Sequence, residues 1–482
     1  MNNTRRTFLR RIAVGGGIMA TGLPSFAKVI GASDDEMKRS ADAETRMQQF
    51  NMCGYAAPKL ETVRVGIVGL GMRGSDAVER LSYIDGLEIT AICDKYPDRV
   101  GAAQKTLGKM GRPKAKEYSG EEGWKALCES NEVDLVYTPS PWHLHTPVAL
   151  YAMRNGKHAA TEVPAGKTMD ELWELVETSE KTKKHCMMLE NCCYDFFELL
   201  TLNMVRQGLL GEIVHAEGAY IHDLTKDYLF NKNGYADMWR LKENIGTGGN
   251  RYPTHGLGPV AQCMNINRGD KFDHLVSMSS NDFTLAPMAK QLAATDDFFK
   301  EYADKTYRGN MNTTLIRTNK GRTIMVQHDV STMRPYSRIH LVSGTKGVVQ
   351  KWPSPERVAF GHSWIKEEEL KKLYDQYSPP IVKHIGSIAK EVGGHGGMDF
   401  IMDWRLIDCL RNGLPLDQNV YDAAAWSCLY PLTQRSVAKK SRTVDIPDFT
   451  RGAWQTNTPV DITLNGGATT GVRTIKPELK MQ

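Results

Sequence analysis

A glycine-rich turn between an apolar run and a helix-like segment constrains the fold of this chain most. The sequence GLGMRG occupies residues 69–74, directly after the apolar run 63–68. In such a turn Gly69 permits a tight bend, Gly71 lets the backbone approach a pyrophosphate, and Gly74 allows the helix to pack closely on the strand. Asp94 ends the next strand-like run, about twenty residues further on, where a carboxylate binds ribose hydroxyls and repels a 2′-phosphate. We therefore predict a Rossmann-type site for NAD.

Strand-like and helix-like segments alternate through the first part of the chain. We expect strands at 63–68, 87–93, 133–138, 158–162 and 186–189, and helices at 75–83, 98–110, 121–129, 147–154 and 170–184. Alternation of this kind, with short loops, favours a parallel, doubly wound α/β sheet. The prediction is an NAD-binding Rossmann domain over residues 61–195.

The pattern changes after about residue 191. Longer strand candidates follow at 213–222, 275–278, 312–318, 323–330, 338–343 and 348–351, with helices at 197–207, 398–412 and 420–439. These segments predict a C-terminal α+β domain over residues 196–450, built on an open, largely antiparallel sheet with one face left for solvent or a partner. We therefore expect a substrate domain that can also form a homo-oligomer, followed by a mostly irregular tail at 451–482.

The N-terminus has the pattern of an export signal. Residues 4–10 read TRRTFLR, a weakly apolar stretch covers 12–23, and small residues surround the possible cleavage point at 25–27. This order is typical of a cleaved leader, and the paired arginines indicate the twin-arginine machinery, which exports folded proteins. The stretch is too short for a permanent membrane span. We predict a signal peptide at 1–27, a tether and extension at 28–60, and a periplasmic or otherwise exported protein.

Charge and cysteine content exclude several classes of function. Removing the leader's four arginines lowers the formal net charge from +5 to +1, which leaves no electrostatic footprint for nucleic acid. The nine cysteines have no spacing typical of a zinc site or a disulfide framework. His143 and His145 form an H-x-H pair, but no third ligand stands beside them in the sequence. We expect no metal site and no essential disulfide.

A second block of motifs is similar to the glucose–fructose oxidoreductase and inositol dehydrogenase (Gfo/Idh/MocA) superfamily. The block runs from TPSPWHLH at 138–145 through GKH at 156–158 to Glu162-Val163-Pro164. In that superfamily a Glu-Lys-Pro turn borders the nicotinamide, and its lysine helps to move the substrate's proton. Here Val163 stands in the lysine's place, and valine has no proton to move. The resemblance therefore argues against a net dehydrogenase that uses the standard proton donor.

Within the superfamily the chain resembles glycoside hydrolase family 109, the NAD-dependent α-N-acetylgalactosaminidases. The motifs that carry this likeness are GMRG at 71–74, WHLH at 142–145, Glu162-Val163, Asn191 and YPTH at 252–255. The resemblance implies the following NAD contacts: Met72, Arg73, Asp94, Trp142, His143, Leu144, His145, Glu162, Val163 and Asn191. It also implies a sugar site lined by Tyr220, Arg240, Tyr252, Pro253, Thr254, His255 and Tyr336.

The chemistry that this resemblance implies differs from direct hydrolysis by two carboxylates. The sugar is oxidised transiently at C3, the C2 proton is removed, the C1 substituent is eliminated, water adds, and C3 is reduced again. A base near neutral pH favours histidine, and we assign His255 to the C3 hydroxyl. The glycines on either side of it in the stretch 248–258 indicate a loop close to a ligand. Tyr252 is expected to orient His255 or relay its proton, Tyr194 is a candidate for the C2 proton, and Arg240 could bind hydroxyls.

The leading hypothesis is therefore an exported glycosidase that uses bound NAD with no net redox change. One alternative is an exported NAD-dependent sugar oxidoreductase with another proton donor. A second alternative is an NAD-loaded sugar-binding protein without catalysis. His395, in the glycine-rich stretch 393–397, remains open as a substrate contact, a supporting residue or part of a helix start.

Overall fold

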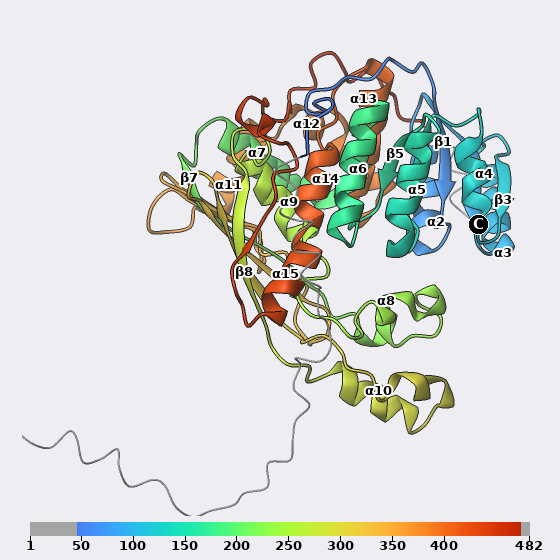
Figure 1. The fold of residues 1–482 in the computed structure, drawn as a ribbon. Helices are drawn as coiled ribbons and strands as arrows, with labels where there is room; N and C mark the ends of the chain where they lie inside the picture. The colour runs from blue at the N-terminus through green and yellow to red at the C-terminus, as the bar shows by residue number, and fades with distance from the viewer. Residues whose placement is uncertain (1–45, 474–482) are drawn as a thin grey trace, which may run out of the picture. The chain divides into compact units, whose positions relative to one another are not determined.

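The fold rests on two β-sheets of different construction. It is described from a computed structural model of the chain, for residues 46–473 (Figure 1). The first sheet is parallel throughout, and the second is mixed but mostly antiparallel. Both features agree with the fold class predicted from the sequence, whereas the predicted leader at 1–27 lies outside the described residues.

The first sheet has the strand order β3-β2-β1-β4-β5-β6. Its strands are β1 (Val63–Val68), β2 (Leu87–Asp94), β3 (Lys116–Ser119), β4 (Leu135–Thr138), β5 (His158–Thr161) and β6 (Cys186–Met188). The order reverses between β1 and β4, and ligands of doubly wound sheets bind at that switch point. The edge strand β3 was not predicted because its sequence, KEYS, has no apolar run.

Five helices connect these strands. They are α2 (Met72–Ser82), α3 (Pro97–Lys109), α4 (Gly123–Glu129), α5 (Trp142–Arg154) and α6 (Met169–Thr182), and Figure 1 shows α5 and α6 side by side. The prediction placed the start of the fourth helix at Pro147, a residue type favoured in a first turn. Instead, α5 begins at Trp142 and continues through Pro147. The segment 142–145 is therefore the first turn of a helix.

The second sheet has the order β13-β12-β11-β7-β10-β9-β8-β14. Its strands are β7 (Ile213–Ile221), β8 (Phe272–Ser279), β9 (Asn312–Thr318), β10 (Thr323–Asp329), β11 (Leu341–Gly344), β12 (Val348–Gln350), β13 (Arg357–Ala359) and β14 (Val444–Asp445). Among these, β7 and β10 pair in parallel and the other pairs are antiparallel.

One face of this sheet is covered and the other is open. Helix α9 (Thr254–Cys263) packs on β7, and α15 (Leu429–Ala438) lies along β8 (Figure 1). Along β9 and β10 the burial alternates, so that Ile316 and Val326 are buried while Leu315 is exposed. This alternation is the pattern of a sheet with one core face and one free face.

The remaining helices surround the second sheet and join it to the first. They are α7 (Phe196–Arg206), α8 (Trp239–Lys242), α10 (Leu285–Ala293), α11 (Glu367–Tyr377), α12 (Pro380–Val392), α13 (Met398–Asn412) and α14 (Val420–Ser427). The single helix expected over 420–439 is two helices, α14 and α15. Helix α13 is buried along almost its whole length and contacts both α2 and α12.

The segments before and after the two sheets are anchored to them. Met52 donates its backbone N–H to the Tyr421 hydroxyl, and Trp404 donates its indole N–H to the carbonyl of Thr470. The described part of the C-terminal stretch, residues 451–473, is mostly irregular, as expected, and the contact between Trp404 and Thr470 anchors it. Within residues 46–473 no helix is both long and apolar enough to cross a bilayer.

Candidate active site

A cavity of about 300 Å³ lies where the ends of the parallel strands meet the second sheet. Its walls come from the glycine-rich turn, the start of α5, the segment 222–240 and the start of α9. The residues that line the cavity include Gly69, Gly71, Met72, Arg73, Asp94, Trp142, Glu162, Val163, Asn191, Tyr220, His222, Arg240, Tyr252, His255 and His395. The structure thus brings together most of the residues predicted for the site.

The glycine-rich turn has the geometry of a phosphate cradle. Gly69 has a φ of 100°, which favours glycine, and a Cβ on Gly74 would lie 1.9 Å from the carbonyl oxygen of Gly69. Helix α2 begins at Met72, so its N-terminal amides face the cavity, where they favour an anion. Asp94 is fixed beside the turn because it accepts the Leu70 N–H at 2.6 Å. These residues fit a dinucleotide without further change.

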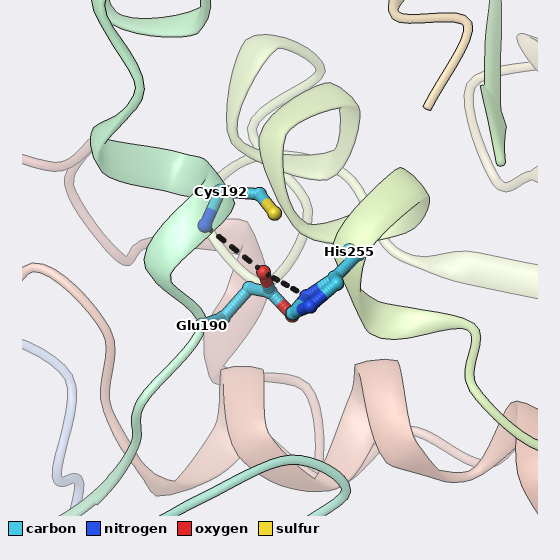
Figure 2. Close-up of side chains that lie close together, drawn as sticks. All are labelled: Glu190, Cys192 and His255. Atoms are coloured by element: carbon cyan, nitrogen blue, oxygen red, sulfur yellow. Dashed lines mark hydrogen bonds and ion pairs between the residues drawn. The ribbon is translucent and has the colours of Figure 1, made fainter. Parts of the chain in front are cut away.

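His255 is held by a buried carboxylate that the sequence analysis did not identify. Its Nδ1 lies 2.7 and 3.0 Å from the two oxygens of Glu190, and Figure 2 shows Glu190 between His255 and Cys192. Burial alone would raise the pKa of Glu190, but the His255 ring, helped by hydrogen bonds from Thr254 and the Cys192 backbone, holds that pKa below its usual value. An ionised carboxylate only accepts, so Nδ1–H donates and Nε2 is left as the basic nitrogen.

Glu190, Cys192 and His255 also place three possible metal-ligand atoms within 4.8 Å of one another. The donor chemistry favours the hydrogen-bonded pair over a metal site. Glu190 already accepts the backbone N–H of Cys192 at 3.1 Å as well as the His255 ring. Burial raises the pKa of the Cys192 thiol well above its usual range, whereas metals bind the thiolate.

A second charged cluster adjoins the cradle. Arg73 donates to Glu162 at 2.6 Å and to Asp399 at 2.8 Å, and Asn191 donates to the other oxygen of Asp399 at 2.5 Å. The His395 Nδ1 lies 2.8 Å from Asp399. Burial would raise the pKa of Asp399, but Arg73 and its other partners hold that pKa well below the usual range. Asp399 is therefore a buried carboxylate that positions three cavity residues.

Aromatic rings and one guanidinium form another part of the cavity wall. Arg240 lies 5.0 Å above the ring of Tyr252 and 5.4 Å above that of Trp142, and it donates to the Tyr235 hydroxyl at 2.5 Å. The Tyr220 ring lies 4.7 Å from that of Tyr252. Burial raises the pKa of Tyr220 to about 12, although Arg240 opposes this shift. The arrangement combines stacking surfaces with hydroxyl and cationic donors, which suits a sugar.

Val163 lines this cavity with an exposed fraction of 1%. No lysine is among the lining residues of the described chain. Lys167, four positions further on, donates instead to Glu243 at 2.7 Å. The position that would carry the proton-moving lysine of a superfamily dehydrogenase is therefore apolar, and no neighbouring lysine replaces it.

Several predicted residues lie outside the cavity. Its walls do not include Gly74, His143, Leu144, Tyr194, Pro253, Thr254 or Tyr336. Gly74 acts through packing of the turn, and the Tyr336 ring lies behind the wall, 5.1 Å from that of His222. The ring nitrogens of His145, which does reach the cavity, are 2.7 and 2.8 Å from the carbonyls of Pro164 and Ser140.

The structure removes Tyr194 from the candidates for the C2 proton. Its hydroxyl donates to Asp417 at 3.4 Å, away from the cavity walls. The prediction was wrong because closeness to Asn191 in the sequence does not determine where the Tyr194 side chain points. Residues 191–194 form a short 3₁₀ turn, and the Tyr194 side chain is buried in the core.

The loop predicted around His255 is the first turn of α9. Gly256 and Gly258 were interpreted as loop residues near a ligand, but both are inside the helix. A Cβ on Gly256 would lie 2.2 Å from the backbone nitrogen of Ala219, and one on Gly258 would meet Glu190 at 3.0 Å. These glycines therefore allow α9 to approach β7 and the carboxylate that holds His255.

Comparisons with known proteins agree with the two parts of this fold. Residues 63–190 match the model of the oxidoreductase family with an NAD-binding Rossmann fold. Residues 194–456 match the model of the glycosyl hydrolase 109 C-terminal domain. Among solved structures, levoglucosan dehydrogenase in complex with NADH superposes with a TM-score of 0.60 at 17% identity, covering 80% of this chain and 99% of that one. A scyllo-inositol dehydrogenase from Lactobacillus casei gives 0.55 at 14% identity, over the same shares.

The relatives are closer in sequence. Glycosyl hydrolase family 109 protein 2 of Phocaeicola vulgatus is 48% identical over 413 residues, which cover 85% of this chain and all of that protein. The α-N-acetylgalactosaminidase of Bacteroides fragilis is 48% identical over 412 residues, which cover 84% and 96%. The nucleotide-binding sheet and the second domain define a Gfo/Idh/MocA-type protein. Within that class the chain belongs to glycoside hydrolase family 109, and it is a glycoside hydrolase.

Proposed function

We propose that this protein removes terminal α-linked N-acetylgalactosamine residues, using a resident NAD with no net redox change. The observation that carries the proposal is the combination of groups in one cavity. A dinucleotide cradle, an oriented histidine and an apolar Val163 line the same walls. Two carboxylates flanking a scissile bond, the usual arrangement for direct hydrolysis, are not needed by this route. The named relative in Bacteroides fragilis supports the choice of sugar.

The chain's own groups suit the first proton transfer. When bound, NAD supplies the transient oxidation at C3 of the sugar. His255 takes the proton from the C3 hydroxyl through Nε2, because Glu190 holds Nδ1–H. Glu190 also stabilises the imidazolium that forms. Asp94, which accepts the Leu70 N–H beside the turn, supports the choice of NAD, because a carboxylate there would repel a 2′-phosphate.

The C2 proton requires a second base in the cavity, and we assign it to Tyr252. Its ring lies 4.8 Å from that of His255. Tyr252 lines the cavity, which Tyr194 does not. Burial raises the pKa of Tyr252 well above its usual value, and the Arg240 guanidinium above the ring only partly opposes that shift. Acting as the tyrosinate, Tyr252 takes the C2 proton and becomes the phenol, and it returns a proton to C2 once water has added at C1. His255 keeps the C3 hydroxyl proton until C3 is reduced again.

Substrate choice is tested with purified protein and no added nucleotide. A panel of aryl glycosides should contain α- and β-linked N-acetylgalactosamine, N-acetylglucosamine and galactose. We expect fastest release of the aryl group from the α-N-acetylgalactosaminide, with no accumulation of NADH. No release from any member would overturn the proposal, and NADH accumulation with free sugar would instead indicate an oxidoreductase.

We further propose that the protein is exported by the twin-arginine route. The paired arginines at 5 and 6 support this, and a cofactor loaded before export suits an enzyme that regenerates it in place. Replacing both arginines by lysine should retain the protein, with its leader, in the cytoplasm. Export of the doubly substituted protein at the normal level would contradict the route.

The open face of the second sheet is our candidate for a homo-oligomer contact. Leu315 and Met278 are exposed there, at 50% and 65%. Sedimentation of wild type and Leu315→Lys tests the proposal: the substitution should shift an oligomer towards monomer. A wild type that sediments as a monomer at micromolar concentration would exclude it.

A further inference from the structure

One segment of the second domain reaches back to the nucleotide-binding domain beside the cavity. We call this segment, residues 225–242, the strap, and it ends with α8. Both of its ends are fixed within the second domain. Before it, Leu224 donates its backbone N–H to the carbonyl of Val330 at 3.0 Å, and after it Gly246 donates to the carbonyl of Thr306 at 2.7 Å. The strap is therefore a long excursion between two anchored points.

The strap forms part of the wall of the cavity assigned to the nucleotide. Its residues 234–236 line the same cavity as the glycine-rich turn and Asp94. The ring of Trp239, the first residue of α8, lies 5.4 Å from that of Trp142, the first residue of α5 (Figure 1). The strap thus contacts the nucleotide-binding domain next to the place where a dinucleotide is expected.

Asp237, which directly follows these lining residues, binds the two residues that follow Asp94. Its carboxylate accepts the Tyr96 hydroxyl at 3.0 Å and lies 3.4 Å from the Lys95 Nζ. Lys95 also pairs with Glu121 at 2.9 Å, so its charge is divided between two carboxylates. Asp94 in turn accepts the backbone N–H of Tyr96 at 3.0 Å. A short chain of hydrogen bonds therefore joins the carboxylate assigned to the ribose with the strap.

The backbone that presents Asp237 has an uncommon conformation. Asp237 has a φ of 55° and Met238 a φ of 52°, both in the left-handed region that L-residues rarely occupy. Such a conformation persists only where surrounding contacts fix it. Here the Met238 side chain is buried, and the Asp237 carboxylate is bound by Tyr96 and Lys95. The contact with these two residues is therefore one of the constraints that hold the strap in place.

We propose that the contact of Asp237 with Tyr96 and Lys95 is a latch that keeps NAD in its cavity; this rests on the proposed function. None of these three residues lines the cavity, so they act on the nucleotide through the strap rather than by contact. Release of the nucleotide requires the strap to move, and the strap moves only when the latch opens. Slow opening suits an enzyme that retains one cofactor through many turnovers.

The test measures how fast the purified protein releases the NAD that it holds. The protein is diluted into an excess of isotopically heavy NAD, and the light NAD still bound is measured over time by mass spectrometry. Asp237→Gly removes the carboxylate and accepts the left-handed backbone, and we expect release to be about fivefold to tenfold faster. Tyr96→Phe removes only the hydroxyl and should accelerate release about threefold. Release at the wild-type rate in both variants would overturn the proposal.

A double variant distinguishes the latch from a general loosening of the strap. If the Tyr96 hydroxyl acts through Asp237, the double variant should release NAD no faster than Asp237→Gly alone. Acceleration equal to the product of the two single effects would contradict the latch.

Asp85→Gly is the matched control. Asp85 is also a partly exposed aspartate, paired with Arg473 at 2.9 Å, and it is not a cavity residue. Asp85→Gly should release NAD at the wild-type rate, and acceleration as large as that of Asp237→Gly would overturn the proposal. A wild type that holds no NAD and binds none when it is added would instead refute the proposed function itself.

Discussion

At the scale of single residues, Glu190 decides how His255 can act. Its carboxylate fixes Nδ1–H and leaves Nε2 to the cavity. Glu190→Gln keeps the shape but allows the amide N–H to donate to Nδ1, which selects the wrong tautomer. We expect kcat to fall about a thousandfold, on the scale of losses seen when the carboxylate of such a pair is made neutral.

The measurement is the rate at which variants that retain bound nucleotide release the aryl group from an aryl glycoside. Glu180→Gln is the matched control, because Glu180 is also buried and accepts from Tyr421 at 2.9 Å and Arg451 at 2.8 Å, outside the cavity. That control should keep its turnover. Wild-type turnover in Glu190→Gln would show that His255 needs no carboxylate.

The sequence could identify His255 but not its partner. A histidine between Tyr252 and Gly256 near the middle of the chain is visible as a candidate. Glu190 and His255 come from distant segments, and nothing in the local pattern at Glu190 distinguishes it from other acids. Asp399 was missed for the same reason: only the folded chain brings it to Arg73, Asn191 and His395.

At the scale of elements, the contact between α9 and β7 sets the position of His255. Gly218 and Gly256 face each other with no room for a side chain. In Gly256→Ala the new methyl would meet the backbone of Ala219, so α9 must move. We expect a loss of about 1–3 kcal/mol in the free energy of unfolding and a larger relative loss of activity, since His255 moves with the helix.

Urea unfolding measures the loss of stability, and release of the aryl group from an aryl glycoside measures the loss of activity. Gly101→Ala in α3 is the control, because nothing lies within 4 Å of a Cβ there. That substitution should stabilise the protein by about 0.5–1 kcal/mol with unchanged activity. If Gly256→Ala behaved in the same way, the close approach of α9 would not matter for the site.

The same contact explains what periodicity could and could not predict. Most strands and helices of the first sheet have clear apolar patterns, and these were predicted within a few residues. Helix α9 was taken for a loop because each glycine lowers helix propensity by about 1 kcal/mol. Its glycines serve packing against β7 and Glu190, a tertiary requirement that no local pattern contains.

At the scale of the whole molecule, Asp399 joins the nucleotide-binding sheet to α13. Its buried carboxylate binds Arg73 at 2.8 Å and lies 3.8 Å from Arg80 on α2. Removing one partner of a buried ion pair leaves the other charge uncompensated. Asp399→Asn should therefore lower the free energy of unfolding by about 3 kcal/mol at neutral pH.

The pH dependence follows from the lowered pKa of Asp399. A carboxyl whose folded pKa lies below its unfolded value of about 3.9 stabilises the fold above that pH. The stabilisation is lost as pH falls towards the folded pKa, so the difference between wild type and Asp399→Asn should shrink below about pH 4. Urea unfolding at neutral pH and below about pH 4 tests this. Asp375→Asn is the control, because Asp375 is exposed. If wild type and Asp399→Asn had the same free energy of unfolding at neutral pH, the role of Asp399 would be contradicted.

The central claim for the molecule is that its cofactor acts by transient oxidation inside a glycosidase. The most direct test is cleavage of an aryl α-N-acetylgalactosaminide in deuterated water without added nucleotide, followed by mass and NMR analysis of the sugar. The account predicts deuterium at C2 of the released sugar and no net formation of NADH. Cleavage that leaves hydrogen at C2 would contradict it.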